Sequence, residues 1–81
     1  MFYVYILQSN RNGSYYIGCT DDITRRLSEH NMGKVKSTKA YKPWLLQYTE
    51  KYNTLSEARK REKQIKHWKS RTAIERLLKK L

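Results

Sequence analysis

Hydrophobic residues near the N-terminus gather in two short segments that predict β-strands. Residues 2–7 (FYVYIL) and 15–19 (YYIGC) are rich in aromatic and β-branched side chains, which favour strands. The segment between them, residues 9–14 (SNRNGS), contains an Asn-Gly pair, which is typical of a tight turn. The pattern therefore predicts a β-hairpin.

The length of that turn decides which tyrosines share a face of the hairpin. Side chains alternate between the two faces of a strand. An even-numbered turn places Tyr3 and Tyr5 on the same face as Tyr16 and Gly18. An odd-numbered turn places the two pairs on opposite faces, and the sequence leaves both arrangements open.

A helix is predicted directly after the hairpin. Residues 20–22 (TDD) offer side-chain oxygens that can cap a helix, and Gly33 provides a typical end. Between them, one helical stripe contains Ile23, Arg26, Leu27 and His30.

The rest of the chain predicts a lysine-rich loop, a strand and two helices. Residues 34–43 form the loop, residues 44–49 (WLLQYT) the strand, and residues 54–57 (TLSE) a capping box that opens a helix. Apolar spacing continues in that helix with Leu55, Ala58 and Ile65, and in the last one with Ile74, Leu77, Leu78 and Leu81. We expect an α+β fold of order β-β-α-β-α-α, with a small, three-stranded, mostly antiparallel sheet flanked by helices. Residues 1–81 are predicted to form one domain, with residues 69–81 as a C-terminal amphipathic helix that packs on it.

The net charge of the chain limits the class of molecule that it is expected to bind. The chain has 81 residues and a formal net charge of +11, and such an excess is typical of proteins that bind a polyanion. Cys19 is the only cysteine, which excludes an internal disulfide and favours a reducing compartment. No apolar run approaches the ~18 residues of a membrane span, so we expect a cytoplasmic protein without a membrane partner.

Glu62 is the residue that fits its surroundings least. It lies on the same predicted helical stripe as the apolar residues Ala58 and Ile65. A buried carboxylate is costly unless it is paired or binds a metal. A salt bridge to a lysine or arginine, a position at the wet edge of the stripe, and a metal site are the three readings that remain.

Arg26, His30 and the strand tyrosines are further candidates. Arginine suits phosphate oxygens, and histidine exchanges protons near neutral pH. A phenol with a pKa of ~10 becomes a useful base only beside a cation or a metal-bound water. The alternative is that Arg26 lies on the surface and that His30, Tyr5 and Tyr16 are ordinary packing residues.

Basic side chains of the loop and the helices are candidates for phosphate contacts, which position nucleic acid without reading its sequence. The alternative is an ordinary solvated face. The candidates are Arg25, Lys34, Lys36, Lys39, Lys42, Arg59, Lys63 and Lys66.

Taken together, these residues resemble the GIY-YIG nuclease superfamily, in particular its small, single-domain bacterial members. The first motif of the family stands here as Tyr3-Val4-Tyr5, with its glycine replaced, and the second is intact as Tyr16-Ile17-Gly18. Arg26, His30 and Glu62 follow in the family's order. An asparagine that many members carry after the glutamate is missing, since residues 63–81 contain none.

The resemblance implies a divalent-metal-dependent DNA endonuclease that hydrolyses phosphodiester bonds. Glu62 would bind one Mg²⁺ or Mn²⁺ ion, and Arg26 would neutralise charge on the phosphate. Tyr5, Tyr16 and His30 all remain candidates for the general base.

Two other functions stay open on the sequence alone. The chain could be a nucleic-acid-binding module that retains the fold with little or no catalysis, or a scaffold whose basic face binds an acidic protein. Single-stranded and branched DNA are among the substrates to consider. A partner protein or a homodimer has no readable signature in the sequence.

Overall fold

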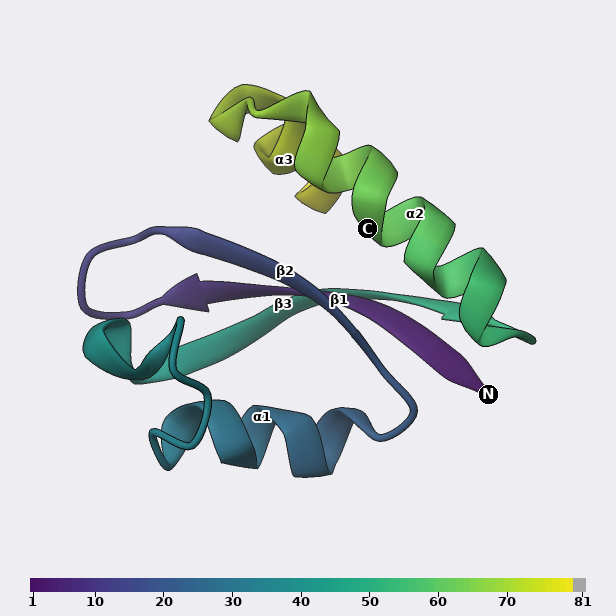
Figure 1. The fold of residues 1–81 in the computed structure, drawn as a ribbon. Coiled ribbons are helices and arrows are strands. Elements are labelled where there is room, and N and C mark those ends of the chain that lie inside the picture. The colour runs from purple at the N-terminus through teal and green to yellow at the C-terminus, as the bar shows by residue number, and fades with distance from the viewer. Residues whose placement is uncertain (80–81) are drawn as a thin grey trace.

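The computed structural model describes residues 1–79 and contains one antiparallel sheet with helices on both faces (Figure 1). The predicted α+β fold and the order β-β-α-β-α-α are confirmed. A short 3₁₀ helix, η1 (Lys39–Tyr41), lies within the lysine-rich loop. The strands and α-helices are β1 (Phe2–Ser9), β2 (Tyr15–Thr20), α1 (Ile23–Asn31), β3 (Trp44–Tyr52), α2 (Leu55–Trp68) and α3 (Arg71–Leu78).

The sheet has the order β2-β1-β3, and its register settles the question of the turn. The Ser9 amide donates to the Ser14 carbonyl at 2.8 Å, which leaves an even-numbered turn of four residues. Tyr5 is consequently paired with Gly18. Because side chains alternate, Tyr5 and Tyr16 lie on the same face of the hairpin.

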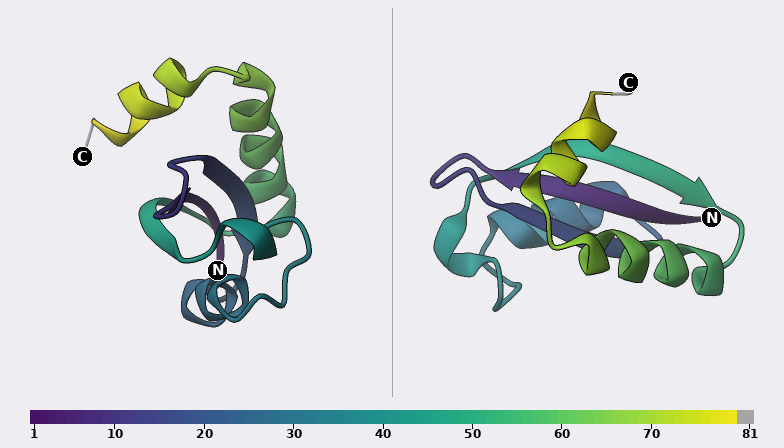
Figure 2. Two further views of the ribbon diagram at one scale, coloured as in Figure 1. Left: turned by 90° about the vertical axis from the view of Figure 1, so that its left-hand side faces the viewer. Right: turned by 90° about the horizontal axis from the view of Figure 1, so that it is seen from above.

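The two faces of the sheet bury different side chains. α2 and α3 cover one face and α1 covers the other, as the turned views also show (Figure 2). The α1 side buries Tyr5, Leu7 and Trp44. The core on the α2 side consists of Val4, Ile6, Ile17, Ala58, Ile65, Ile74 and Leu77.

Leu55 corrects the predicted core. Ala58 and Ile65 are buried as expected, but the Leu55 side chain is 38% exposed. Leu55 is the first residue of α2, and it lies at the rim of a cleft rather than over the sheet. The apolar stripe therefore faces the core only from Ala58 onward.

Side-chain caps begin all three α-helices of residues 1–79. Asp22, Thr54 and Ser70 each accept a hydrogen bond from a backbone amide in the first turn, which satisfies a donor that the helix itself leaves unpaired. Of the predicted capping box, the bond from the Glu57 amide to the Thr54 hydroxyl is present, while the Glu57 carboxylate accepts from that same hydroxyl. Gly33 follows α1 with a φ of 76°, a conformation that favours glycine.

A charged network fixes α2 to the edge strand β3. The Glu50 carboxylate accepts hydrogen bonds from Tyr48, Tyr52 and Arg61, and the Arg61 Nε lies 2.9 Å from Glu50 Oε1. Burial alone would raise the pKa of Glu50, but these hydrogen bonds hold it below its ordinary value. The network sets the position of α2 relative to the sheet.

α3 is anchored to the sheet and to the hairpin turn. Ile74 and Leu77 are buried, while Arg71 donates to the Gly13 carbonyl at 2.9 Å. Leu81, which was expected on the same stripe, lies outside the described residues. None of the helices in residues 1–79 is long and apolar enough to cross a membrane.

Candidate active site

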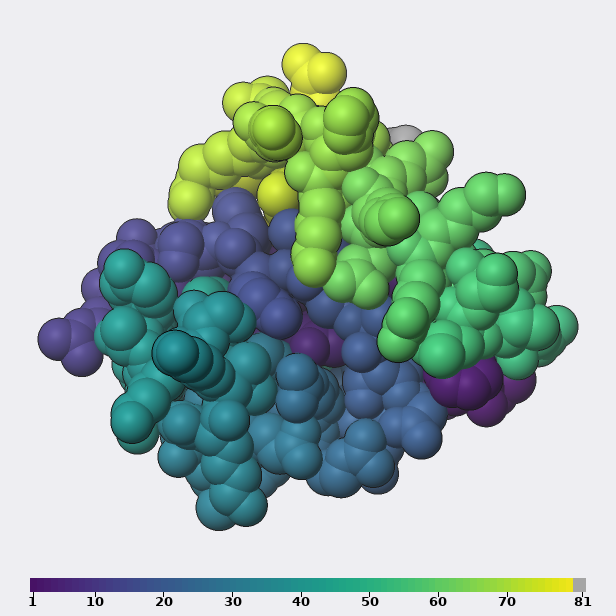
Figure 3. Space-filling model, in the orientation of Figure 1, coloured from purple at the N-terminus to yellow at the C-terminus, as the bar shows by residue number. Residues whose placement is uncertain are grey.

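A cleft of about 560 Å³ lies at the exposed edge of β2, where α1 and α2 approach from opposite faces of the sheet. In the space-filling view it is a hollow between the green side chains of α2 and the blue surface of β2 and α1 (Figure 3). Four of the five predicted catalytic residues line it, namely Tyr5, Tyr16, Arg26 and Glu62. Gly18, Cys19, Leu55, Arg59, Lys63 and Lys66 complete the wall.

Gly18 allows Tyr5 to reach this cleft from the central strand. The two residues are paired across β1 and β2, and the Tyr5 phenol passes directly over Gly18. A Cβ atom at Gly18 would overlap the ring and hydroxyl of Tyr5. The glycine of the second motif is therefore required by close approach rather than by its backbone angles.

We expect Gly18→Ala to displace Tyr5 and to lower the free energy of unfolding by about 1–3 kcal/mol, as overpacking does. Urea unfolding followed by circular dichroism measures the stability, and the ¹⁵N resonances of the His30 ring report whether Tyr5 still contacts it. Gly13→Ala is the control, because Gly13 has a φ of 78° but no close Cβ contact. A shifted His30 resonance in both variants, or in neither, would contradict the prediction.

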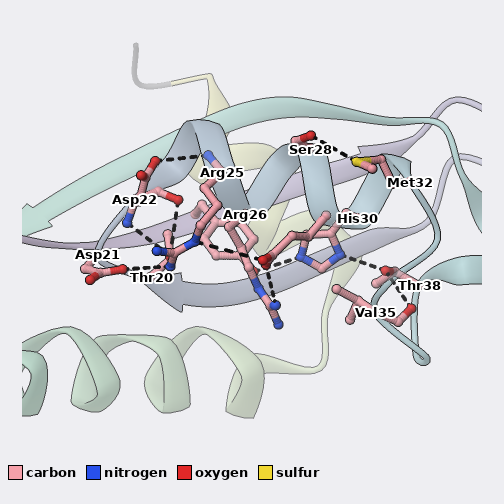
Figure 4. Close-up of polar contacts among 12 residues, drawn as sticks. Thr20, Asp21, Asp22, Arg25, Arg26, Ser28, His30, Met32, Val35 and Thr38 are labelled. Carbon is pink, nitrogen blue, oxygen red and sulfur yellow. Dashed lines mark hydrogen bonds and ion pairs between the residues drawn. The ribbon is translucent and has the colours of Figure 1, made fainter.

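His30 lies behind Tyr5 and holds it through a buried chain of hydrogen bonds. Its Nε2 is 2.9 Å from the Tyr5 hydroxyl, and its Nδ1 is 2.7 Å from Thr38 Oγ1. Thr38 in turn donates to the Val35 carbonyl (Figure 4). The threonine hydroxyl therefore accepts from Nδ1–H, which leaves Nε2 to accept the Tyr5 proton.

The surroundings keep both members of this pair neutral. Burial, followed by the positive charge of Arg26, lowers the pKa of His30 to about 4. Burial raises the pKa of Tyr5 to about 12 against the opposing effect of Arg26. The phenol is thus protonated near neutral pH, and the imidazole is free of an added proton.

Arg26 and Tyr16 are half-buried side chains in the wall of the cleft. Arg26 Nη1 is 3.0 Å from Glu29 Oε1, an ion pair that also raises the pKa of Arg26 and keeps it charged. The Tyr16 ring lies 5.0 Å from the His30 ring and 6.4 Å from the Tyr5 ring, measured between centroids. The predicted convergence of two phenols, a guanidinium and an imidazole is present in the structure.

Glu62 faces the cleft from α2 and carries an ion pair. Its Oε2 is 2.6 Å from the Lys66 ammonium, and its side chain is 20% exposed. Two of the three alternatives left open by the sequence therefore hold: Glu62 forms a salt bridge, and it lies at the solvent-accessible edge of the apolar stripe. The third remains compatible, because an oxygen that already binds an ammonium in the cleft is accessible to a cation.

The donor set limits the kind of metal that Glu62 could bind. Residues 1–79 contain no cluster of three or more His, Cys, Asp or Glu side chains suited to a metal. Mg²⁺ often uses one or two carboxylates and completes its coordination with water and phosphate oxygens. Glu62 fits such an ion and does not fit a metal that needs a complete protein cage.

The predicted nucleic-acid-binding residues divide into three groups. Arg59, Lys63 and Lys66 line the cleft beside Glu62. Arg25 lies beside Arg26 and is paired with Asp21 at 2.9 Å. The loop lysines are exposed and are not part of the cleft wall; they are Lys34, Lys36, Lys39 and Lys42.

One contributor to the site was missed in the sequence. Thr38 fixes the orientation of His30 from the lysine-rich loop, and no local pattern marks it. Lys66 was predicted as a phosphate contact but not singled out as the partner of Glu62, although the spacing of four residues on one helix was a readable signal.

Comparison with known proteins identifies the family of this site. Residues 1–76 match the GIY-YIG catalytic domain. The chain belongs to the GIY-YIG family. This match supports the nuclease class that the motifs implied.

Similar members of the family are small proteins of about the same length. A UPF0213 protein of Halobacterium salinarum is 42% identical over 67 residues, which cover 82% of this chain and 86% of that protein. A UPF0213 protein of Staphylococcus epidermidis is 48% identical over 65 residues, 79% of this chain and 78% of that protein. The solution structure of a UPF0213 protein from Bacillus halodurans superposes with a TM-score of 0.61 at 38% identity, covering 98% of this chain and 84% of that chain.

Proposed function

We propose that this GIY-YIG protein is a divalent-cation-dependent endonuclease that hydrolyses phosphodiester bonds in DNA. The observation that carries the proposal is the convergence of Tyr5, Tyr16, Arg26 and Glu62 on one cleft, with His30 bonded to Tyr5 from behind. Proton acceptors, a charge-neutralising group and a cation ligand are the groups that phosphodiester hydrolysis needs.

Tyr5 and His30 supply a proton relay. With a pKa of about 12, the Tyr5 phenol is too seldom ionised at neutral pH to act alone. Its proton can pass to Nε2 of His30 while its oxygen takes a proton from the attacking water. The water oxygen then bonds to phosphorus as the bond from phosphorus to the leaving oxygen breaks.

Arg26 and Tyr16 act on the phosphate and the water. The planar guanidinium of Arg26 is paired with Glu29 and lines the cleft, where it can neutralise charge that develops on the phosphate oxygens. Tyr16 lies in the cleft wall between Lys66 and the Tyr5–His30 pair. Its hydroxyl is suited to orient the attacking water.

Glu62 would hold the cation, Mg²⁺ or Mn²⁺, with water and phosphate oxygens as the other ligands. When bound, such an ion polarises the phosphate and stabilises the leaving oxygen. Arg59, Lys63 and Lys66 would bind the flanking phosphates on the same side of the cleft.

The proposal is tested by incubating the protein with end-labelled single-stranded, duplex and branched DNA in Mg²⁺, Mn²⁺ or EDTA. We expect cuts on at least one substrate with a divalent cation and none in EDTA. Glu62→Gln purified in the same way controls for a contaminating nuclease. Cleavage in EDTA, or equal cleavage by that variant, would sink the proposal.

Binding of nucleic acid without cleavage is the second candidate. It is favoured by Tyr3 in the place of the first-motif glycine and by the lack of an asparagine in residues 63–81. In that case wild type would leave every substrate intact and would still bind DNA, with an affinity that falls steeply as salt is added. Affinity that is absent or insensitive to salt would instead favour an acidic protein as the partner.

A further inference from the structure

Lys66 and Glu62 form an ion pair inside the candidate site. They lie one turn apart on α2, and both line the cleft. The Lys66 ammonium is 2.6 Å from Glu62 Oε2 and 5.9 Å from the centroid of the Tyr16 ring. A positive charge thus already lies between the carboxylate and one of the phenols.

The ammonium and a divalent cation need the same carboxylate charge. Glu62 is the one acidic side chain in the wall of the cleft, so a cation in the cleft has no second protein carboxylate to use there. Placing a divalent cation beside an ammonium that still contacts the same carboxylate would bring like charges together. Occupation by one therefore disfavours occupation by the other.

The pair is also built to open. The Lys66 side chain is 47% exposed, whereas that of Glu62 is 20% exposed. Lysine has a long flexible stem and a compact charge, so its ammonium can leave the carboxylate and remain in the cleft. A phosphate bound beside Arg59 and Lys63 offers the ammonium another anionic partner at little cost, since ion pairs with one exposed member contribute little to stability.

We propose that Lys66 is a positioning residue that serves as the internal counter-ion of Glu62 until a divalent cation replaces it and a DNA phosphate receives the ammonium. This inference rests on the proposed function. It predicts that, without DNA, the protein binds the cation more weakly than it would if Glu62 had no ammonium partner. It also predicts that bound DNA removes this loss of affinity.

Lys63 provides a matched control. It lines the same cleft from the same helix, and its replacement removes the same charge. Lys63 is not among the ion-pair partners of Glu62 in residues 1–79. A comparison of the two lysines therefore separates direct competition for the Glu62 carboxylate from the general repulsion of a cation by the positive charges of the cleft.

The experiment measures Mn²⁺ affinity without DNA, from the electron paramagnetic resonance signal of the free ion. We expect Lys66→Met to bind Mn²⁺ roughly two- to fivefold more tightly than Lys63→Met does, the range that a partly exposed ion pair supports. Lys66→Gln should behave like Lys66→Met, and Glu62→Gln should lose the site. Circular dichroism confirms that each variant is folded.

A second measurement repeats the titration with a phosphorothioate oligonucleotide that resists cleavage. DNA should tighten Mn²⁺ binding more in wild type than in Lys66→Met, because only wild type has an ammonium to release. Equal affinities of the Lys66 and Lys63 variants without DNA, or an equal effect of DNA on wild type and on Lys66→Met, would overturn the inference while leaving the proposed function intact. Mn²⁺ binding that Glu62→Gln does not weaken would overturn both.

Discussion

DNA cleavage by Glu62→Gln is expected to be at least ~10³-fold slower than cleavage by wild type, a loss of several kcal/mol of transition-state stabilisation. Glutamine preserves the size of the side chain and removes the charge that the cation requires. Binding should not weaken, because the substitution removes a negative charge from a wall that also contains Lys63 and Lys66. Single-turnover cleavage in Mg²⁺ and fluorescence anisotropy in EDTA measure the two quantities separately.

Glu75→Gln is the matched control for this loss. Glu75 lies on α3, is half-buried, and pairs with Arg71 at 3.5 Å, so the same change of charge takes place away from the cleft wall. We expect its cleavage rate to stay within about twofold of wild type, as for most surface substitutions. A Glu62→Gln protein that cuts as fast as this control would remove Glu62 from the mechanism.

Local signals in the sequence were enough to predict the elements of the fold. The Asn-Gly turn, the capping residues before α1 and α2, and Gly33 all act within a few residues of the backbone they shape. Their physical effects are therefore visible in a short window. Whether Tyr5 and Tyr16 share a face of the hairpin could not be predicted in this way. It depends on whether the turn has an even or an odd number of residues, which only the strand register shows.

Glu62 shows how far a pattern can lead toward a site. A carboxylate among apolar positions indicated that this side of α2 does not face the hydrophobic core along its whole length. The pattern could not tell where the core ends, and Leu55 was wrongly assigned to it. The position of the cleft decides this, since Leu55, the first residue of α2, lines it together with Gly18 and Cys19 of β2.

The electrostatic state of the site depended on contacts distant in sequence. The residues next to His30 in the sequence do not indicate that it is fully buried. They also do not indicate that its Nδ1 bonds to Thr38 and its Nε2 to Tyr5, which is 25 positions away. The loop that supplies Thr38 looked like a lysine-rich phosphate-binding segment. Its clearest contribution in the structure is the hydrogen bond that orients His30.

Tyr5→Phe is expected to reduce the cleavage rate by about 10²–10⁴-fold, the range for the loss of a proton-transferring group. The change removes the hydroxyl that donates to His30 and leaves the buried Nε2 without its partner, which costs about 1–3 kcal/mol of stability. Rates are therefore compared under conditions in which circular dichroism shows the variant to be folded. Tyr3→Phe is the control, since Tyr3 lies two residues earlier on the same strand and lines a separate hollow beside Asp21.

The pH profile of the wild-type rate tests the same relay. His30 can accept the Tyr5 proton only while it is neutral, and its pKa is lowered to about 4. Acid should therefore reduce the rate only as the pH falls toward 4, and the ordinary histidine range near 6.5 should show no inflection. Tyr16→Phe separates the two phenols: if it abolishes cleavage while Tyr5→Phe retains it, the base is Tyr16. An inflection near 6.5 would instead mean that His30 is solvated during turnover, because burial is the main cause of its low pKa.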